Sequence, residues 1–246
     1  PSAVFAAIVF DAVVACMPSV AGRARTTWIV AAIASPLLLQ SGLVLSDLSI
    51  DRQEAQRRTI NAVHQIFPEP VPYVDHSAMI ASFPKVNFFM STWGVERYRE
   101  RGMSFMEPAL MRHRPKFVLA NQAVLFPGAE QFDRLLPVDR ELIVNSYVRY
   151  WGPIFVAGSD IELPPLGQGR VTLPFPGGYR VEADQPVEIA NRLYAGGDVL
   201  QARDDELEFV VRNLADNTLR IRVVWQGAQQ APVPELPPII PLYSNL

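Results

Sequence analysis

Two long apolar runs open the chain, at residues 1–20 and 26–45. A helix rises 1.5 Å per residue, so about 20 residues cross the roughly 30 Å hydrocarbon core of a bilayer. The pattern therefore predicts two transmembrane helices within residues 1–46. The short linker AGRAR contains two arginines, which the positive-inside rule places in the cytoplasm. Everything after Leu45 is then expected on the outer side.

Beyond the apolar runs, helical patterns alternate with short apolar segments. We expect helices at 47–66, 93–101, 107–114 and 137–151, the last being a helix or a helix running into a strand, and strands at 73–75, 116–120 and 154–158. This alternation is typical of an α/β layer. It predicts an α/β periplasmic domain over residues 47–160, with a small mixed sheet.

The pattern changes after Gly158, where apolar and polar residues alternate with a period of two. The segments RVTLPF, YRVEA, PVEIAN, DELEFVVRNL and TLRIRVVWQG are separated by turn sequences such as PGG and AGG. This spacing predicts an antiparallel β-sandwich-like domain over residues 161–231. Residues 232–246 are rich in proline and are expected to form an extended tail. The predicted fold class is thus α+β and membrane-anchored.

Composition adds few constraints. Charged residues make up 19% of the chain, below the roughly 25% usual for soluble domains, and the first 46 residues contain only Asp11, Arg23 and Arg25 as charged side chains. A formal net charge of −3 gives no basic surface, so no nucleic-acid partner is expected. The lone Cys16 excludes an intrachain disulfide and a CxxC metal site. Asp11 in the first apolar run indicates that this helix packs against other helices. The chain has no initiator Met and begins inside an apolar run, which indicates the C-terminal part of a longer polytopic protein.

A first group of chemically active residues lies in a proline-rich stretch, where Tyr73, Asp75 and His76 nearly adjoin. A carboxylate beside an imidazole suits acid–base or metal chemistry. Neighbouring residues on a strand point to opposite faces, however. A turn-capping Asp75 with a surface histidine is the alternative interpretation, and the sequence favours it.

A second group combines aromatic residues with arginines at 93–101, where Trp93, Arg97 and Tyr98 stand out. Arginines beside aromatic rings can grip a phosphate or stack on a sugar ring. The alternative is a solvated amphipathic helix in which Glu96 pairs with Arg99. No metal pair, phosphate loop or nucleophile motif occurs elsewhere in the chain.

The stretches PYVDHSAMIASFPKVNFFMSTWGVERYRERG, RPKFVLAN and PGGYRVEADQPVEIAN, read after the two apolar runs, resemble the C-terminal portion of a family of bacterial membrane glycosyltransferases. These are the GT-C-fold enzymes that use polyprenyl-phosphate sugars, such as the aminoarabinose and dolichyl-phosphate-mannose transferases. The similarity covers most of the chain, although it includes no diagnostic motif.

The resemblance implies a polyprenyl-phosphate-linked sugar donor, an envelope glycan, lipid or protein acceptor, and the lipid bilayer as partners. Transfer would take place at the outer face of the bacterial inner membrane, with this portion periplasmic, capping the site and helping to select the acceptor. The family's catalytic carboxylate lies in a first external loop that this sequence does not contain. We therefore expect substrate contacts at Tyr73, Asp75, Trp93, Arg97 and Tyr98, with no assigned catalytic residue.

No cofactor is expected in this portion, whereas a divalent metal in a missing part of the enzyme would be compatible with the family. The alternative function is not enzymatic. Two membrane helices with a mixed ectodomain would also suit an envelope-complex subunit, or a carbohydrate- or peptide-binding module.

Overall fold

The computed structural model describes residues 52–234 and Leu242. They belong to one compact unit that extends from Arg52 to Leu246. Residues 1–46, for which the sequence predicts two transmembrane helices, lie outside the described residues.

The described part contains four α-helices and two short 3₁₀ helices. The α-helices are α3 (Arg52–Ile66), α4 (Thr92–Arg101), α5 (Met106–Arg112) and α6 (Pro137–Ser146), and the 3₁₀ helices are η1 (Ala123–Leu125) and η2 (Glu130–Arg134). Arg112 ends α5 three residues before Pro115, because the residue before a proline disfavours helical backbone. Pro137 occupies the first turn of α6, where its missing N–H costs nothing.

Eleven strands form two sheets. They are β1 (Tyr73–Asp75), β2 (Phe117–Leu119), β3 (Tyr147–Trp151), β4 (Ile154–Leu163), β5 (Gln168–Thr172), β6 (Gly177–Glu182), β7 (Val187–Ile189), β8 (Arg192–Tyr194), β9 (Val199–Ala202), β10 (Glu208–Asn213) and β11 (Leu219–Trp225). The seven-stranded sheet has the order β1-β2-β4-β11-β6-β9, with β3 also paired to β4. The four-stranded sheet has the order β5-β10-β7-β8. Strands β1 and β2 run parallel, whereas the other strand pairs of the described part are antiparallel.

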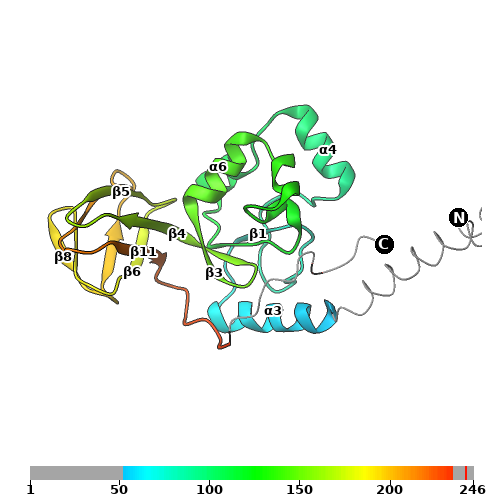
Figure 1. Ribbon diagram of the computed structural model, residues 1–246. Coiled ribbons are helices and arrows are strands. Elements are labelled where there is room, and N and C mark those ends of the chain that lie inside the picture. The colour runs from blue at the N-terminus through cyan, green and yellow to red at the C-terminus, as the bar shows by residue number, and fades with distance from the viewer. Residues whose placement is uncertain (1–51, 235–241, 243–246) are drawn as a thin grey trace, which may run out of the picture. The chain divides into compact units, whose positions relative to one another are not determined.

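Helices cover both faces of the β1-β2-β4 region (Figure 1). Successive residues of a strand point to opposite faces. Phe117 and Leu119 therefore pack with α3 in one apolar cluster. Val118, between them, packs with α4, α5 and α6 in the other. Three apolar residues in a row are what a strand buried on both sides requires.

The long strand β4 joins the helical region to the sandwich. Its first half pairs with β2 and β3, and its second half, from Gly158, pairs with β11. Inward residues of the two sheets, such as Val171, Val211 and Ile221, belong to the same apolar cluster as α4–α6. The described part therefore has a core that runs without interruption from the helices into the sandwich.

The predicted fold class is wrong for the part of the chain that the structure describes. That part is β-rich, and the seven-stranded sheet passes through both the α/β domain and the sandwich-like domain that the sequence separates at residue 160, a position inside β4. Among the described helices, none is long and apolar enough to cross a membrane. The prediction failed because alternating patterns indicate single strands but not which strands share a sheet.

Candidate functional site

Helix α4 is fixed at both ends and on one face. The Ser91 side chain accepts a hydrogen bond from the Gly94 N–H at 3.1 Å and so caps the first turn. Gly102 ends the helix in the left-handed conformation, with φ of 61°. Val95 and Tyr98 are buried in the core. The remaining faces of α4 are free to present polar side chains.

Charges on α4 are separated between its two exposed flanks. At about 100° per residue, Arg97 and Arg101 lie about 40° apart around the helix axis. Glu96 and Arg99 lie about 100° and 160° from Arg97, whereas Glu100 lies only about 60° from it, and all five residues are exposed. The positive flank, which carries Arg97 and Arg101, therefore has no carboxylate between its two arginines, and both glutamates lie on the side of Arg97 that faces away from Arg101.

The positive flank borders a cleft of about 430 Å³. We call it the α4 cleft, and it is lined by Phe88, Phe89, Gly94, Arg97, Tyr98, Arg101, Met103 and Phe105. The rings of Phe88, Tyr98 and Phe105 lie within 5.7 Å of one another, centroid to centroid. This volume is typical of small-molecule sites, which combine apolar walls with a few polar groups.

Gly94 lets α4 approach the aromatic segment closely. A Cβ at this position would lie 2.5 Å from the carbonyl oxygen of Phe89. Such a distance is too short for any side chain. Glycine at 94 thus brings the first turn of α4 against the segment that supplies Phe88 and Phe89.

A buried carboxylate holds the inner wall of the α4 cleft. Asp139, on α6, accepts hydrogen bonds from the Tyr98 hydroxyl at 2.5 Å, the Ser104 hydroxyl at 2.5 Å and the Met106 N–H at 3.0 Å. The Tyr98 hydroxyl also accepts from the Leu136 N–H at 2.7 Å. Burial, together with the bond to Asp139, raises the pKa of Tyr98 well above its usual value. Tyr98 is therefore a neutral, fixed wall at physiological pH.

Both cleft arginines lack an internal counter-charge. Within residues 52–234, neither the Arg97 nor the Arg101 side chain forms an ion pair or hydrogen bond. A guanidinium group is a permanent cation with five N–H donors, and the geometry of these donors fits the oxygens of a carboxylate or a phosphate. The α4 cleft therefore offers two available cations beside a wall of aromatic rings.

The five residues predicted as substrate contacts separate into two groups. Arg97 and Tyr98 line the α4 cleft. Trp93 lies one turn before Arg97 and is 84% exposed. Tyr73 and Asp75 are instead fully buried on β1. The structure thus brings three of the five together and places the other two in the core.

Tyr73 and Asp75 make internal contacts. The Tyr73 hydroxyl exchanges hydrogen bonds with the backbone of Ile80. The Asp75 carboxylate accepts from the N–H groups of Ala78 at 2.8 Å and Met79 at 2.7 Å. The alternative interpretation of Asp75 as a turn-capping residue is confirmed.

Two basic side chains, Lys85 and His76, lie near Asp75. The Lys85 ammonium lies 3.7 Å from the carboxylate and donates to the backbone carbonyls of Asn87 and Phe88. Burial lowers the pKa of Lys85 to about 8, although Asp75 opposes this shift. Burial also lowers the pKa of His76, whose ring lies 6.4 Å from that of Phe89. These contacts hold the segment that carries Phe88 and Phe89.

Sequence reasoning missed most of the lining of the α4 cleft. Phe88, Phe89, Met103 and Phe105 come from segments before and after α4 that carry no regular pattern. Arg101 could have been found, because it follows Arg97 by four residues and therefore shares its flank.

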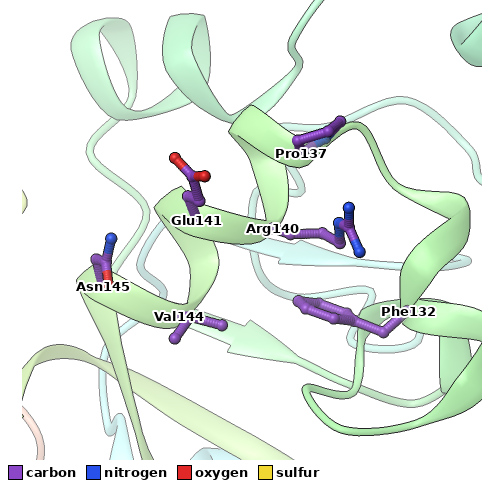
Figure 2. Close-up of a pocket in the computed structure, with 6 residues that line it drawn as sticks. All are labelled: Phe132, Pro137, Arg140, Glu141, Val144 and Asn145. Carbon is purple, nitrogen blue, oxygen red and sulfur yellow. The ribbon is translucent and has the colours of Figure 1, made fainter.

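A second hollow, of about 270 Å³, lies between η2 and α6. Figure 2 shows its lining, in which Glu141 and Asn145 project away from Arg140 and Phe132. Arg140 forms an ion pair with Asp133. Because its polar groups do not converge and its cation is already paired, this hollow is a weaker candidate than the α4 cleft.

Among the described residues, no three His, Cys, Asp or Glu side chains are grouped as metal ligands.

No family model matches the chain, and no curated protein and no solved structure is detectably similar to it.

Proposed function

We propose that this chain is part of a bacterial glycosyltransferase that moves a sugar from a polyprenyl-phosphate donor to an envelope glycan, lipid or protein, and that the α4 cleft binds the phosphate end of the carrier. The observation that carries the proposal is the pair of unpaired arginines, Arg97 and Arg101, beside aromatic walls. The proposal assigns transfer to the outer face of the inner membrane.

The chemistry of the α4 cleft suits an amphiphilic phosphate. Charge-assisted bonds from guanidinium to phosphate oxygens are about twice as strong as neutral hydrogen bonds, and Arg97 and Arg101 are close enough along α4 to act on one phosphate. The walls formed by Phe88, Phe89 and Phe105 would cover the first isoprene units or the face of a sugar ring. A ligand that is only polar would leave this apolar surface uncovered.

The resemblance stated for the sequence supports the same site. The quoted stretch at residues 72–102 supplies Phe88, Phe89 and all of α4, and Met103 and Phe105 follow it directly. One of the three stretches that carry the similarity therefore builds most of the α4 cleft.

In this proposal the described residues bind and orient the carrier, and the groups that break the glycosidic bond lie elsewhere in the enzyme. Asp75 and Asp139 are buried and fully engaged by internal donors, so neither is assigned as the catalytic carboxylate. A divalent metal is assigned to no described residue.

Binding of farnesyl phosphate, a short carrier analogue, to the full chain in detergent micelles tests the proposal. Each charge-assisted hydrogen bond contributes about 1.5–3 kcal/mol, so the Arg97→Gln/Arg101→Gln double variant should weaken binding by about 100-fold or more. Isothermal titration calorimetry gives the dissociation constants. The matched control is Arg99→Gln, on the opposite flank of α4, which should bind as the unaltered chain does.

Equal weakening by the control variant, or unchanged binding by the double variant, would refute the assignment of the α4 cleft. A second assay measures sugar transfer from a polyprenyl-phosphate sugar by the native protein, in which the double variant should raise the KM for the donor. Binding with no transfer would support the rival function, a non-enzymatic envelope binding module.

A further inference from the structure

Exposed aromatic residues are confined to one place in the described part of the chain. Within residues 52–234, Phe89 and Trp93 are the only exposed aromatic residues, at 60% and 84%. Met103, 70% exposed, lies near them at the end of α4. Every other aromatic side chain in this range is buried or half-buried. This distribution is not that of scattered surface residues.

Two of the three apolar residues line the α4 cleft and the third adjoins a lining residue, and we call these three residues, with Arg97 and Arg101, the mouth of the cleft. Phe89 and Met103 line it from the segments on either side of α4. Trp93 immediately precedes the lining residue Gly94 and lies one turn before Arg97, about 40° around the helix axis from Arg97 and about 20° from Glu100. The mouth thus combines two aromatic rings and a thioether with the two unpaired guanidinium groups.

This combination matches the interfacial region of an anionic bilayer. Indole and phenyl rings are favoured at the level of lipid headgroups, and adjacent arginines are attracted to anionic lipids. A soluble phosphate would satisfy Arg97 and Arg101 but would leave Trp93 in water. A lipid surface covers the rings and satisfies the charges together.

We propose that the mouth of the α4 cleft docks on the surface of an anionic bilayer, with Phe89, Trp93 and Met103 entering the headgroup region. This inference deepens the proposed function and rests on it, because a cleft that opens at the bilayer surface admits the carrier phosphate while the isoprenoid chain stays in lipid. The docking involves described residues only.

A site-specific probe tests docking in the full chain, whose apolar first 45 residues would complicate a bulk vesicle-binding assay. In a Cys16→Ser background, the Met103→Cys variant is labelled with a polarity-sensitive fluorophore. The control is Glu96→Cys with the same label, at a residue that does not line the α4 cleft and lies about 100° around the helix axis from Arg97. Each is mixed with vesicles of phosphatidylglycerol and phosphatidylethanolamine, or of phosphatidylcholine alone, with no polyprenyl phosphate present.

The label at 103 should shift to the blue with anionic vesicles and shift less with neutral ones, while the label at 96 stays in water. Adding Arg97→Gln should raise the lipid concentration at half-maximal shift about fivefold, the loss expected for one arginine near an anionic surface. Adding Trp93→Ser should raise it further, and high salt should weaken the effect. An unshifted label at 103, or equal shifts at 103 and 96, would overturn the inference.

The two proposals fail separately. Farnesyl phosphate bound in micelles through Arg97 and Arg101, with no vesicle-induced shift at 103, would refute docking and leave the proposed function standing. A lipid-dependent shift at 103, without farnesyl phosphate binding, would refute the carrier site and leave a membrane-docking surface.

Discussion

Asp139 shows how one buried residue sets the shape of the α4 cleft. It is fully buried on α6, and its carboxylate binds donors from α4 and from the segment leading into α5. An aspartate on a helix is usually a solvated residue, and the sequence around 139 gives no sign of burial. The role of Asp139 arises because the fold brings Tyr98 and Ser104 to it across more than 30 positions of sequence.

We expect Asp139→Asn to destabilise the protein by about 2–4 kcal/mol, because an amide replaces one acceptor oxygen by a donor that would face the N–H or O–H groups now bound. Urea unfolding monitored by tryptophan fluorescence measures the change. Asp133→Asn is the control, since Asp133 is 76% exposed in its ion pair with Arg140 and should change stability by less than about 0.5 kcal/mol. Similar losses in both variants would contradict this role for Asp139.

At the scale of single elements, prediction from the sequence was most successful where the pattern was regular. The strand at Tyr73–Asp75, the helix at Thr92–Arg101 and the helix running into a strand from Pro137 are confirmed. The short strands β8 and β9 were not predicted, because three or four residues are too few to show a period. The cleft-lining segments around Phe88 and Met103 have no regular structure, so no period in the sequence could predict their position.

Strand β4 depends on a glycine at the point where it changes partners. A Cβ at Gly158 would lie 2.1 Å from the carbonyl oxygen of Val223 on β11. Gly158→Ala should therefore force the β4–β11 pair apart and cost about 1–3 kcal/mol, as overpacking of a well-packed interior does. Thermal unfolding followed by circular dichroism gives the change in Tm.

The comparison variant for this strand is Gly169→Ala on β5, where the nearest atom is a methyl group of Leu163 at 2.6 Å. A side-chain methyl can move, whereas a paired backbone carbonyl cannot, so Gly169→Ala should lower the Tm less. A larger loss of Tm for Gly169→Ala than for Gly158→Ala would contradict the view that the close approach of β4 to β11 requires glycine at 158.

At the scale of the whole molecule, Lys116 lies between the helical region and the sandwich. Its ammonium is 3.8 Å from the ring centroid of Phe175 and 5.3 Å from that of Trp225. Burial, reinforced by Arg114, lowers the pKa of Lys116 to about 8. The contacts with the two rings stabilise the cation, yet they do not offset its loss of hydration.

This lowered pKa gives a pH dependence with a definite sign. Between pH 8 and 10.5 the unfolded chain binds more protons at Lys116 than the folded chain does, so the free energy of unfolding rises with pH in that window. We expect the difference between the unaltered protein and Lys116→Met to shift in favour of the unaltered protein from pH 8 to pH 9.5. Urea unfolding at both pH values measures it, and parallel stability profiles would contradict the lowered pKa.

The sequence by itself determined the local elements, because periods of two and 3.6 residues, prolines and glycines act over short distances. It also identified Trp93, Arg97 and Tyr98 as neighbours on one helix. Only the tertiary structure decided that Tyr73 and Asp75 are buried, that β4 unites two predicted domains, and that aromatic segments converge on the arginines of α4. Those outcomes depend on contacts between residues far apart in the chain, and no local pattern encodes them.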